Sequence, residues 1–160
     1  MNESRDKRHL EMSEIMPPEA ANFKGNVHGG YLLQLLDRVA YACAARFSQG
    51  YVVTLSVDQV LFKQPIYVGE LVTCLASINF VGRTSMEVGI KVIAENLQDG
   101  KQRHTNSCYY TMVAVDDNFR PRSVGELTLR NDLEKRRFEE GKLRRELSRR
   151  FAENKGNKKK

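Results

Sequence analysis

The sequence predicts an α+β domain in which a strongly curved antiparallel sheet wraps around one apolar helix. One candidate strand comes first, an almost wholly apolar helix follows, and four strand-like segments come after it. A helix that is apolar on most sides needs a cover over most of its circumference. A curved sheet provides that cover, and a sheet edge left unpaired favours oligomerisation.

The first part of the chain supplies a strand, a long loop and the helix. Residues His9 to Met16 mix polar and apolar side chains and predict the strand. The segment from Pro17 to Gly30 is rich in Pro, Asn and Gly, which disfavours both helix and strand. From Tyr31 to Phe47 apolar residues recur at helical spacing, and Gly50 is the expected end of the helix.

The four segments after the helix are rich in Val, Ile, Thr, Tyr and Phe, and turn sequences separate them. Short turns join the last three segments, which predicts an antiparallel meander. The predicted strands are Tyr51–Val60, Glu70–Val81, Ser85–Ala94 and His104–Asp116.

The C-terminal part of the chain has a different pattern. Residues 1–126 form the predicted domain, and residues 127–160 form a basic, charged helical extension. From Glu153 onward the extension is expected to be disordered. Its helical part has only a thin apolar stripe, made of Leu133, Phe138, Leu143 and Leu147.

The net charge of the chain is concentrated in this extension. The 160 residues include 26 Lys and Arg against 20 Asp and Glu, a net charge of +6. Residues 130–160 hold 13 of the basic and 6 of the acidic side chains, so residues 1–129 hold 13 and 14. The predicted domain is therefore nearly neutral, and its charge does not indicate a nucleic-acid partner.

Several classes of protein and of site are not expected. Charged residues interrupt the longest apolar candidate, Tyr31 to Phe47, so no membrane span is predicted. The N-terminus lacks the apolar region of a secretory signal. The three cysteines, Cys43, Cys74 and Cys108, are widely spaced and no CxxC or HxxxH occurs, which predicts reduced, buried thiols in a cytoplasmic protein and no metal site.

The glycine-rich loop before the helix is the first candidate for chemistry. Gly25-Asn26-Val27-His28-Gly29-Gly30 runs into a helix start, where free backbone N–H groups can bind an anion or polarise a carbonyl oxygen. Alternatively, the two adjacent glycines make only a turn and a cap. We interpret His28 as a hydrogen-bonding residue of the loop rather than as a base.

Asp37 is the second candidate. It lies mid-helix among apolar residues, where an unpaired carboxylate is costly, so it either reaches solvent or an arginine, or serves as a base. It is about seven residues, or roughly 10 Å, beyond the helix start. A carboxylate at that distance cannot act on an atom held by the first N–H groups of its own helix. A site that uses both features must therefore be shared by two subunits of a symmetric dimer.

A tight turn between two predicted strands is the third candidate. Val81-Gly82-Arg83-Thr84-Ser85-Met86 carries a cation and two hydroxyl groups, which together with backbone N–H groups suit a phosphate. The alternative is a solvent-exposed hairpin tip. The chain has no Walker loop, no GxGxxG and no GxSxG.

Six motifs follow one another between residues 14 and 122. They are Met16 to Asn22, Gly25 to Gly30, Leu36-Asp37, Val53 to Asp58, Phe62 with Pro65 and Gly69, and Val81 to Val88. In kind and order they resemble the hotdog-fold acyl-CoA thioesterases, most closely the cytosolic acyl-CoA hydrolase subgroup. Two departures stand out: many relatives have Phe at the position of His28, and the aspartate motif of 4-hydroxybenzoyl-CoA-type hotdogs is absent. The His-bearing motif of hydroxyacyl dehydratases is also absent.

The resemblance implies a single hotdog domain and a site at a subunit interface. It implies that Asn26 is the catalytic asparagine and orients water or the thioester. It implies that Asp37, from the other protomer, is the general base or nucleophile. The N–H groups around Gly29 and Gly30 would polarise the thioester carbonyl. The segments that contact coenzyme A in such enzymes match Ser56, Val57, Arg83, Thr84 and Ser85.

The expected activity is therefore hydrolysis of fatty acyl-CoA to free acid and CoA by a cytoplasmic homodimer, assembled as a trimer of dimers. No metal and no cofactor beyond the CoA of the substrate is expected, nor is a nucleic-acid or membrane partner. Two alternatives stay open. One is a non-catalytic acyl-CoA-binding or regulatory module. The other is a nucleic-acid or anionic-membrane binder that acts through residues 130–160, although the charges there are mixed, with 6 acidic among 13 basic side chains.

Overall fold

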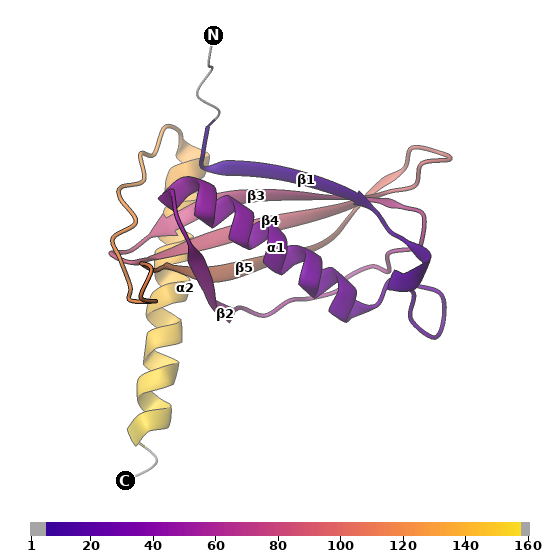
Figure 1. Ribbon diagram of the computed structural model, residues 1–160. Helices are drawn as coiled ribbons and strands as arrows, with labels where there is room; N and C mark the ends of the chain where they lie inside the picture. Colours follow the sequence, from indigo (N-terminus) through magenta and orange to yellow (C-terminus); the bar gives the residue numbers. More distant parts are fainter. Residues whose placement is uncertain (1–5, 158–160) are drawn as a thin grey trace.

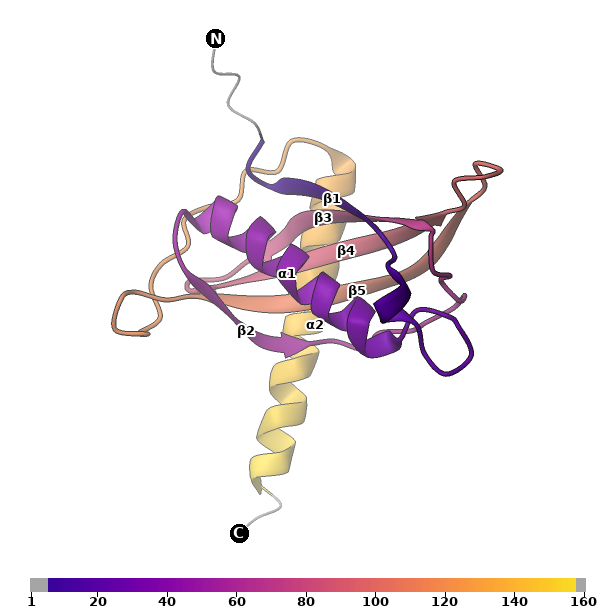
Figure 2. The same cartoon turned by 45° about the vertical axis from the view of Figure 1, so that its right-hand side comes forward.

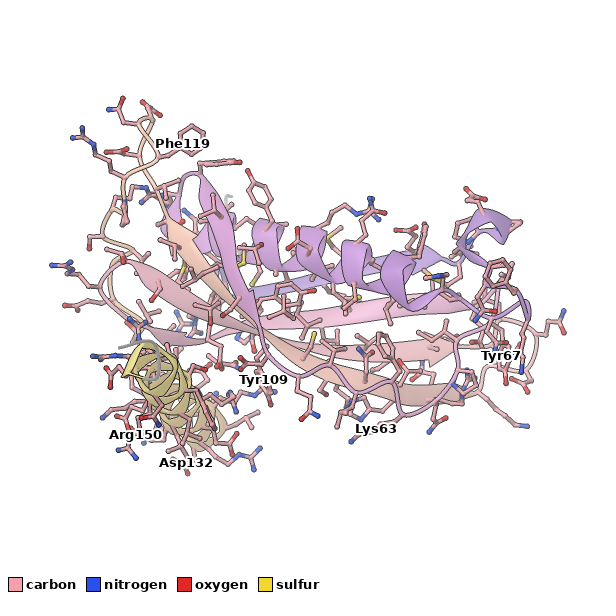
Figure 3. The ribbon with its side chains drawn as sticks, turned by 90° about the horizontal axis from the view of Figure 1, so that it is seen from below. Lys63, Tyr67, Tyr109, Phe119, Asp132 and Arg150 are labelled. Atoms are coloured by element: carbon pink, nitrogen blue, oxygen red, sulfur yellow. The ribbon has the colours of Figure 1, made fainter. Side chains whose placement is uncertain are left out.

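The computed structural model describes residues 6–157, with side chains described through residue 154. Five strands form one antiparallel sheet in the order β1-β3-β4-β5-β2. Helix α1 (Gly29–Ser48) lies on one face of the sheet, and helix α2 (Asp132–Asn157) lies on the opposite face (Figures 1 and 3). The strands are β1 (His9–Ile15), β2 (Val52–Val57), β3 (Leu71–Val81), β4 (Ser85–Glu95) and β5 (Gln102–Ala114).

This arrangement confirms the predicted fold class and the meander of the last three strands. Residues 71–114 run through β3, β4 and β5 in order, and each strand pairs with the next. The sheet curves around α1, which crosses it diagonally (Figure 2). A short 3-10 turn, Pro18–Ala20, lies in the long loop between β1 and α1.

Helix α1 begins two residues earlier than its apolar pattern predicts. His28 has extended backbone angles, and its side-chain Nδ1 accepts a hydrogen bond of 3.0 Å from the N–H of Gly30. His28 is therefore the N-cap, which allows Gly29 and Gly30 to form the first helical positions. The helix ends at Ser48 because Gln49 adopts the left-handed conformation, with φ of 54°.

The hydrophobic core lies between α1 and the concave face of the sheet. Leu36 and Val39 of α1 are fully buried, as are Val88 of β4 and Met112 of β5. The three cysteines also lie in this core, and none forms a disulfide. Burial raises the pKa of each thiol to about 12.

Strand β2 forms one exposed edge of the sheet. It is only six residues long and pairs with β5 on one side, with an irregularity between Thr54 and Ser56. Leu55 and Val57 on this edge are 68% and 43% exposed. An edge strand with exposed apolar side chains can pair with another chain.

Helix α2 packs against the convex face of the sheet through arginines and one glycine. Arg144 donates hydrogen bonds of 2.9 and 2.7 Å to the carboxylate of Glu87 on β4, and its guanidinium lies 3.7 Å from the ring centre of Tyr109. Gly141 lets the helix backbone approach β3 and β4 closely. Figure 3 shows Tyr109 on the α2 side of the sheet.

The thin apolar stripe of this helix contributes one ring contact to the sheet. Phe138 packs against Phe80 with ring centres 5.0 Å apart, whereas the three leucines of the stripe stay 44–56% exposed. The convex face carries Glu87 and Tyr109 where α2 lies, and these groups suit arginine better than leucine. The helix also continues through Asn157, past the expected start of disorder at Glu153, and residues 158–160 lie outside the described residues.

Neither helix of residues 6–157 is long and apolar enough to cross a membrane.

Candidate functional site

Asn22 organises the loop that leads into α1. Its backbone N–H donates to the carbonyl of Asn26 at 2.6 Å. Its side-chain Oδ1 accepts hydrogen bonds from the backbone N–H groups of Lys24, at 2.9 Å, and of Asn26, at 3.2 Å. Gly25 completes the turn with a positive φ of 82°. Both bonds use the oxygen end of the Asn22 amide, which leaves the nitrogen end as a donor.

The two glycines at the helix start differ in what their N–H groups offer. The N–H of Gly30 is already bonded to His28, as the cap requires. The N–H of Gly29 has no hydrogen-bond partner among residues 6–157. In this conformation Gly29 is therefore the better of the two predicted carbonyl-polarising donors.

A cavity of about 260 Å³ opens beside this loop. One wall is the start of α1, another is the segment between β2 and β3, and the third is β5. It combines apolar side chains with several amide groups, and its lining includes Asn22, Asn26, Gly29, Leu32, Phe62 and Asn106. Concave sites of mixed lining near free N–H groups are typical of small-molecule binding.

The wall between β2 and β3 is held by a partly buried ion pair. Arg103 donates hydrogen bonds of 2.7 and 2.9 Å to Glu70, and another of 3.0 Å to the carbonyl of Pro65. The side-chain hydrogen bonds from Arg103 lower the pKa of Glu70, against the opposing effect of burial. The ion pair thus keeps Glu70 charged and fixes the segment that closes the cavity.

Asp37 lies elsewhere, on the exposed side of α1. The hydroxyl of Thr54 on β2 donates a hydrogen bond of 2.7 Å to its carboxylate. Asp37 is the ninth residue of α1, so at 1.5 Å per residue it lies about 12 Å along the axis from Gly29. It does not line the 260 Å³ cavity. A single chain therefore brings Asn26, Gly29 and Gly30 together but keeps Asp37 apart from them.

The residues expected to contact CoA are only partly brought together. Ser56 and Ser85 line a second cavity, of about 340 Å³, between α2 and the convex face of the sheet. Arg145 of α2 lines the same cavity and donates a hydrogen bond to the hydroxyl of Ser85. Arg149 also lines it, whereas the other expected contact residues, Val57, Arg83 and Thr84, do not.

Asp58 adds an acidic group to this second cavity. Burial raises the pKa of its carboxyl group, and nearby Arg144 opposes that rise. The cavity thus contains arginine and hydroxyl donors together with one carboxylate. Within residues 6–157 no cluster of three or more His, Cys, Asp or Glu side chains is arranged to hold a metal ion.

Several residues of these sites have no role predicted from the sequence, among them Asn22, Thr54 and Asn106. Asn22 and Thr54 stand inside motifs that carry the family resemblance, so their position in those motifs was the available signal. Asn106 stands at an inward-facing position of β5, two residues before the buried Cys108. In a strand whose residues alternate between buried and exposed, a polar residue at an inward-facing position is unusual. The sequence of β5 contained this signal.

Comparisons with known proteins agree with this geometry. The sequence model of the thioesterase superfamily matches residues 24–101. An apo-hexameric acyl-CoA thioesterase of known structure superimposes with a TM-score of 0.86, is 32% identical, and is matched over 90% of this chain and 92% of its own. The chain belongs to the thioesterase superfamily. Within it, this chain is an acyl-CoA hydrolase of the hotdog fold.

Two relatives by sequence extend the comparison. Protein VdlD of Helicobacter pylori is 49% identical over 145 residues, which are 91% of this hydrolase and 83% of the relative. The cytosolic acyl coenzyme A thioester hydrolase of Mus musculus is 34% identical over 132 residues, or 81% of this chain. This hydrolase spans about a third (35%) of the mouse protein's length.

The acyl-CoA hydrolase of Staphylococcus aureus has been solved in several forms. Its complex with butyryl coenzyme A, coenzyme A and coenzyme A disulfide has a TM-score of 0.82 and 26% identity, and covers 94% of this chain and 93% of its own. Three further structures carry alanine in place of an asparagine, an aspartate and a threonine. In that protein the asparagine and aspartate are 15 positions apart, and the aspartate and threonine 17 apart.

Proposed function

We propose that this chain hydrolyses the thioester of fatty acyl-CoA to free acid and CoA at a site shared by two subunits. One observation supports a site that two subunits share. The loop of Asn22 and Asn26 opens into the 260 Å³ cavity, whereas Asp37 lies about 12 Å along α1 from Gly29 and outside that cavity. Two chains related by a two-fold axis can bring the loop of one against the aspartate of the other.

Residue spacing supports Asn22 as the catalytic asparagine in preference to Asn26. Asn22, Asp37 and Thr54 are separated by 15 and 17 positions, as are the three residues replaced in the S. aureus hydrolase. Asn26 is 11 positions from Asp37. Both asparagines line the cavity, but the oxygen of Asn22 is held by two backbone N–H groups, which leaves its N–H₂ to donate to a carbonyl.

The proposed reaction assigns each group one role. Asp37, held by the hydroxyl of Thr54, removes a proton from water while the water oxygen attacks the thioester carbon. The carbonyl oxygen becomes an oxyanion, and the N–H of Gly29 and the amide of Asn22 donate to it. The C–S bond then breaks, and the sulfur takes up the proton that Asp37 removed. The products are the carboxylic acid and CoA thiol.

The 340 Å³ cavity under α2 is the proposed site for the phosphates of CoA. Ser56 and Ser85 reach it from the sheet, and Arg145 and Arg149 reach it from α2. Arginine and hydroxyl donors are the groups that phosphates prefer in proteins. Arg145→Ala should raise KM for acyl-CoA but not for the matching acyl-pantetheine, which lacks the nucleotide. An equal rise for both substrates would place the phosphates elsewhere.

We further propose a dimer formed along β2, assembled as a trimer of dimers in the cytoplasm. The exposed apolar edge of β2, the hexameric relatives of known structure and the cytosolic mouse relative support this. We also propose that the reaction uses no metal and no cofactor, because Asp37 activates the water and the N–H groups of Gly29 and Asn22 stabilise the oxyanion.

Mixing two inactive variants tests the shared site. Asn22→Ala and Asp37→Ala chains are denatured together in equal amounts and refolded. Random pairing makes half of the dimers hybrid, and each hybrid has one intact site out of two, so about a quarter of the native activity should return. Thiol release from acyl-CoA is the measurement.

Each variant refolded alone is the control and should show turnover reduced by orders of magnitude. No recovery in hybrids verified by native mass spectrometry would contradict the shared site. Asn26→Ala, tested beside Asn22→Ala, discriminates between the asparagines: the larger loss of kcat identifies the catalytic one. Binding of acyl-CoA without turnover in the wild type would support a non-catalytic module instead.

A further inference from the structure

Asn106 has a side-chain donor with no partner. The residue is fully buried, with 0% of its surface exposed, on the inward face of β5. Its side-chain oxygen lies 3.3 Å from the hydroxyl of Thr105, which donates to it. Its side-chain nitrogen is the one buried polar side-chain atom without a hydrogen-bond partner in the part of the chain that the structure describes.

The residue that carries this donor lines the cavity beside the loop of Asn22 and Asn26. Asn106 lines the 260 Å³ cavity together with the apolar residues Leu32, Phe62 and Ile66. The other residues in its row on β5, including Cys108, Tyr110 and Met112, are buried against the core of the domain. Asn106 itself lines the cavity, so a ligand can reach its N–H₂ group only from the cavity and after a small turn of the side chain, since the nitrogen has less than 1 Å² of accessible surface.

The amide groups that line the cavity differ in burial. Asn22 and Asn26 are half-buried, whereas Asn106 is fully buried. If the thioester carbonyl lies at the loop, as proposed above, the acyl chain extends into the rest of the cavity, where Asn106 is part of the β5 wall. An unsubstituted acyl chain brings no acceptor to that depth and leaves the donor unpaired.

We infer that this hydrolase prefers, among fatty acyl-CoA substrates, those whose acyl chain carries an oxygen substituent, an oxo group above all, that accepts a hydrogen bond from Asn106. The inference rests on the proposed function, because it takes the 260 Å³ cavity as the acyl pocket. A site built to hydrogen-bond its substrate discriminates against an analogue without the bonding group, because the buried polar atom is then left without a partner.

The test compares matched substrates in two proteins. The substrates are hexanoyl-CoA and its 3-oxo, 4-oxo and 5-oxo analogues, and the proteins are the wild type and Asn106→Leu, which has a similar side-chain volume. The preference for an oxo substrate is its kcat/KM divided by that of hexanoyl-CoA. For one oxo position, this ratio should be about 5- to 150-fold larger in the wild type than in Asn106→Leu. At 1.4 kcal/mol per tenfold, this corresponds to about 1–3 kcal/mol for a buried unpaired polar group.

Dividing the wild-type preference by the Asn106→Leu preference removes the intrinsic reactivity of each thioester, as in a double-mutant cycle. Gln64→Leu is the matched control, because Gln64 lines the same cavity but is exposed. It should leave the preference unchanged. Asn106→Leu should also raise the melting temperature of the ligand-free protein by a few degrees, since it removes an unsatisfied donor.

A binding measurement tests this inference independently of the proposed hydrolysis. In Asp37→Asn, calorimetry with non-hydrolysable thioether analogues of the same four chains should give the same preference, lost on adding Asn106→Leu. If the wild type hydrolyses none of the substrates but this preference appears, the proposed hydrolysis fails and the inference holds. If hydrolysis proceeds and no oxo position is preferred through Asn106, ordered water satisfies the amide and the inference is overturned.

Discussion

Gly141 is the point where α2 and the sheet come closest. A Cβ added at Gly141 would lie 2.9 Å from the Cβ of Phe80 and 2.9 Å from Oε1 of Glu87. Carbon atoms in contact are normally about 3.5–4.0 Å apart, so Gly141→Ala requires α2 to retreat by about 0.6–1.1 Å. Neither neighbour can yield, because Phe80 Cβ is fixed to β3 and Arg144 holds the Glu87 carboxylate with bonds of 2.7 and 2.9 Å.

Two effects of this substitution oppose each other. Alanine is more favourable than glycine inside a helix by about 0.8–1.0 kcal/mol. Overpacking of a close contact costs about 1–3 kcal/mol, and the retreat also stretches the Arg144–Glu87 hydrogen bonds. We therefore expect a net loss of stability of up to about 2 kcal/mol, which lowers Tm by up to about 4–8 °C for a chain of this size.

Thermal unfolding followed by circular dichroism, at one fixed protein concentration, measures this loss. Lys142→Ala is the control, because Lys142 is the next residue along α2 and is exposed, so its replacement should change stability by less than about 0.5 kcal/mol. A gain of about 1 kcal/mol in Gly141→Ala would be the helix propensity alone. That result would refute the close packing of α2 on the sheet.

Three further outcomes are expected. Thr54→Val removes the hydrogen bond to Asp37 and should lower kcat about tenfold or more with little change in KM, while Thr54→Ser keeps activity; equal kinetics of both variants would contradict a positioning role. Glu70→Gln should cost about 1.5–3 kcal/mol at pH 7. Arg103 lowers the pKa of Glu70 from 4.5, so the ionised carboxylate stabilises the fold fully above about pH 4.5. This stabilisation is lost as the pH falls through the pKa of Glu70 in the folded chain. Glu70→Gln should therefore lose less stability on acidification than the wild type. Dialysis against EDTA should leave thiol release unchanged. A loss of activity that an added divalent cation restores would contradict the proposed metal-free reaction.

The fold was predictable from the sequence because its signals are local. The apolar pattern of α1 and the strand-like segments that follow it predict a helix wrapped by a sheet. The docking of α2 was not predictable in this way. Its contact residues are Arg144 and Arg145, which in a sequence look like solvated charges. Their partners, Glu87 and Ser85, stand about 60 positions earlier, and no local pattern connects the two.

The candidate site was predictable in part. The number of residues between the helix start and Asp37 was enough to suggest two subunits, since helix geometry converts it into a distance. The choice between Gly29 and Gly30 depends on the side chain of His28, which takes the N–H of Gly30. Residue spacing in the sequence does not predict the rotamer of a side chain. The unpaired amide of Asn106 depends on which groups meet it across the cavity, and this too is a three-dimensional property.

The buried position of the three cysteines bears on an enzyme whose product is itself a thiol. A surface thiolate would attack the disulfide of oxidised CoA, which forms a mixed disulfide and releases one CoA thiol. Here all three sulfurs lie between α1 and the sheet with pKa values of about 12, so in the folded chain they are neither ionised nor accessible at neutral pH. The released coenzyme is then the only reactive thiol present. Colour from a reagent such as Ellman's therefore counts turnovers alone, without a background from the protein.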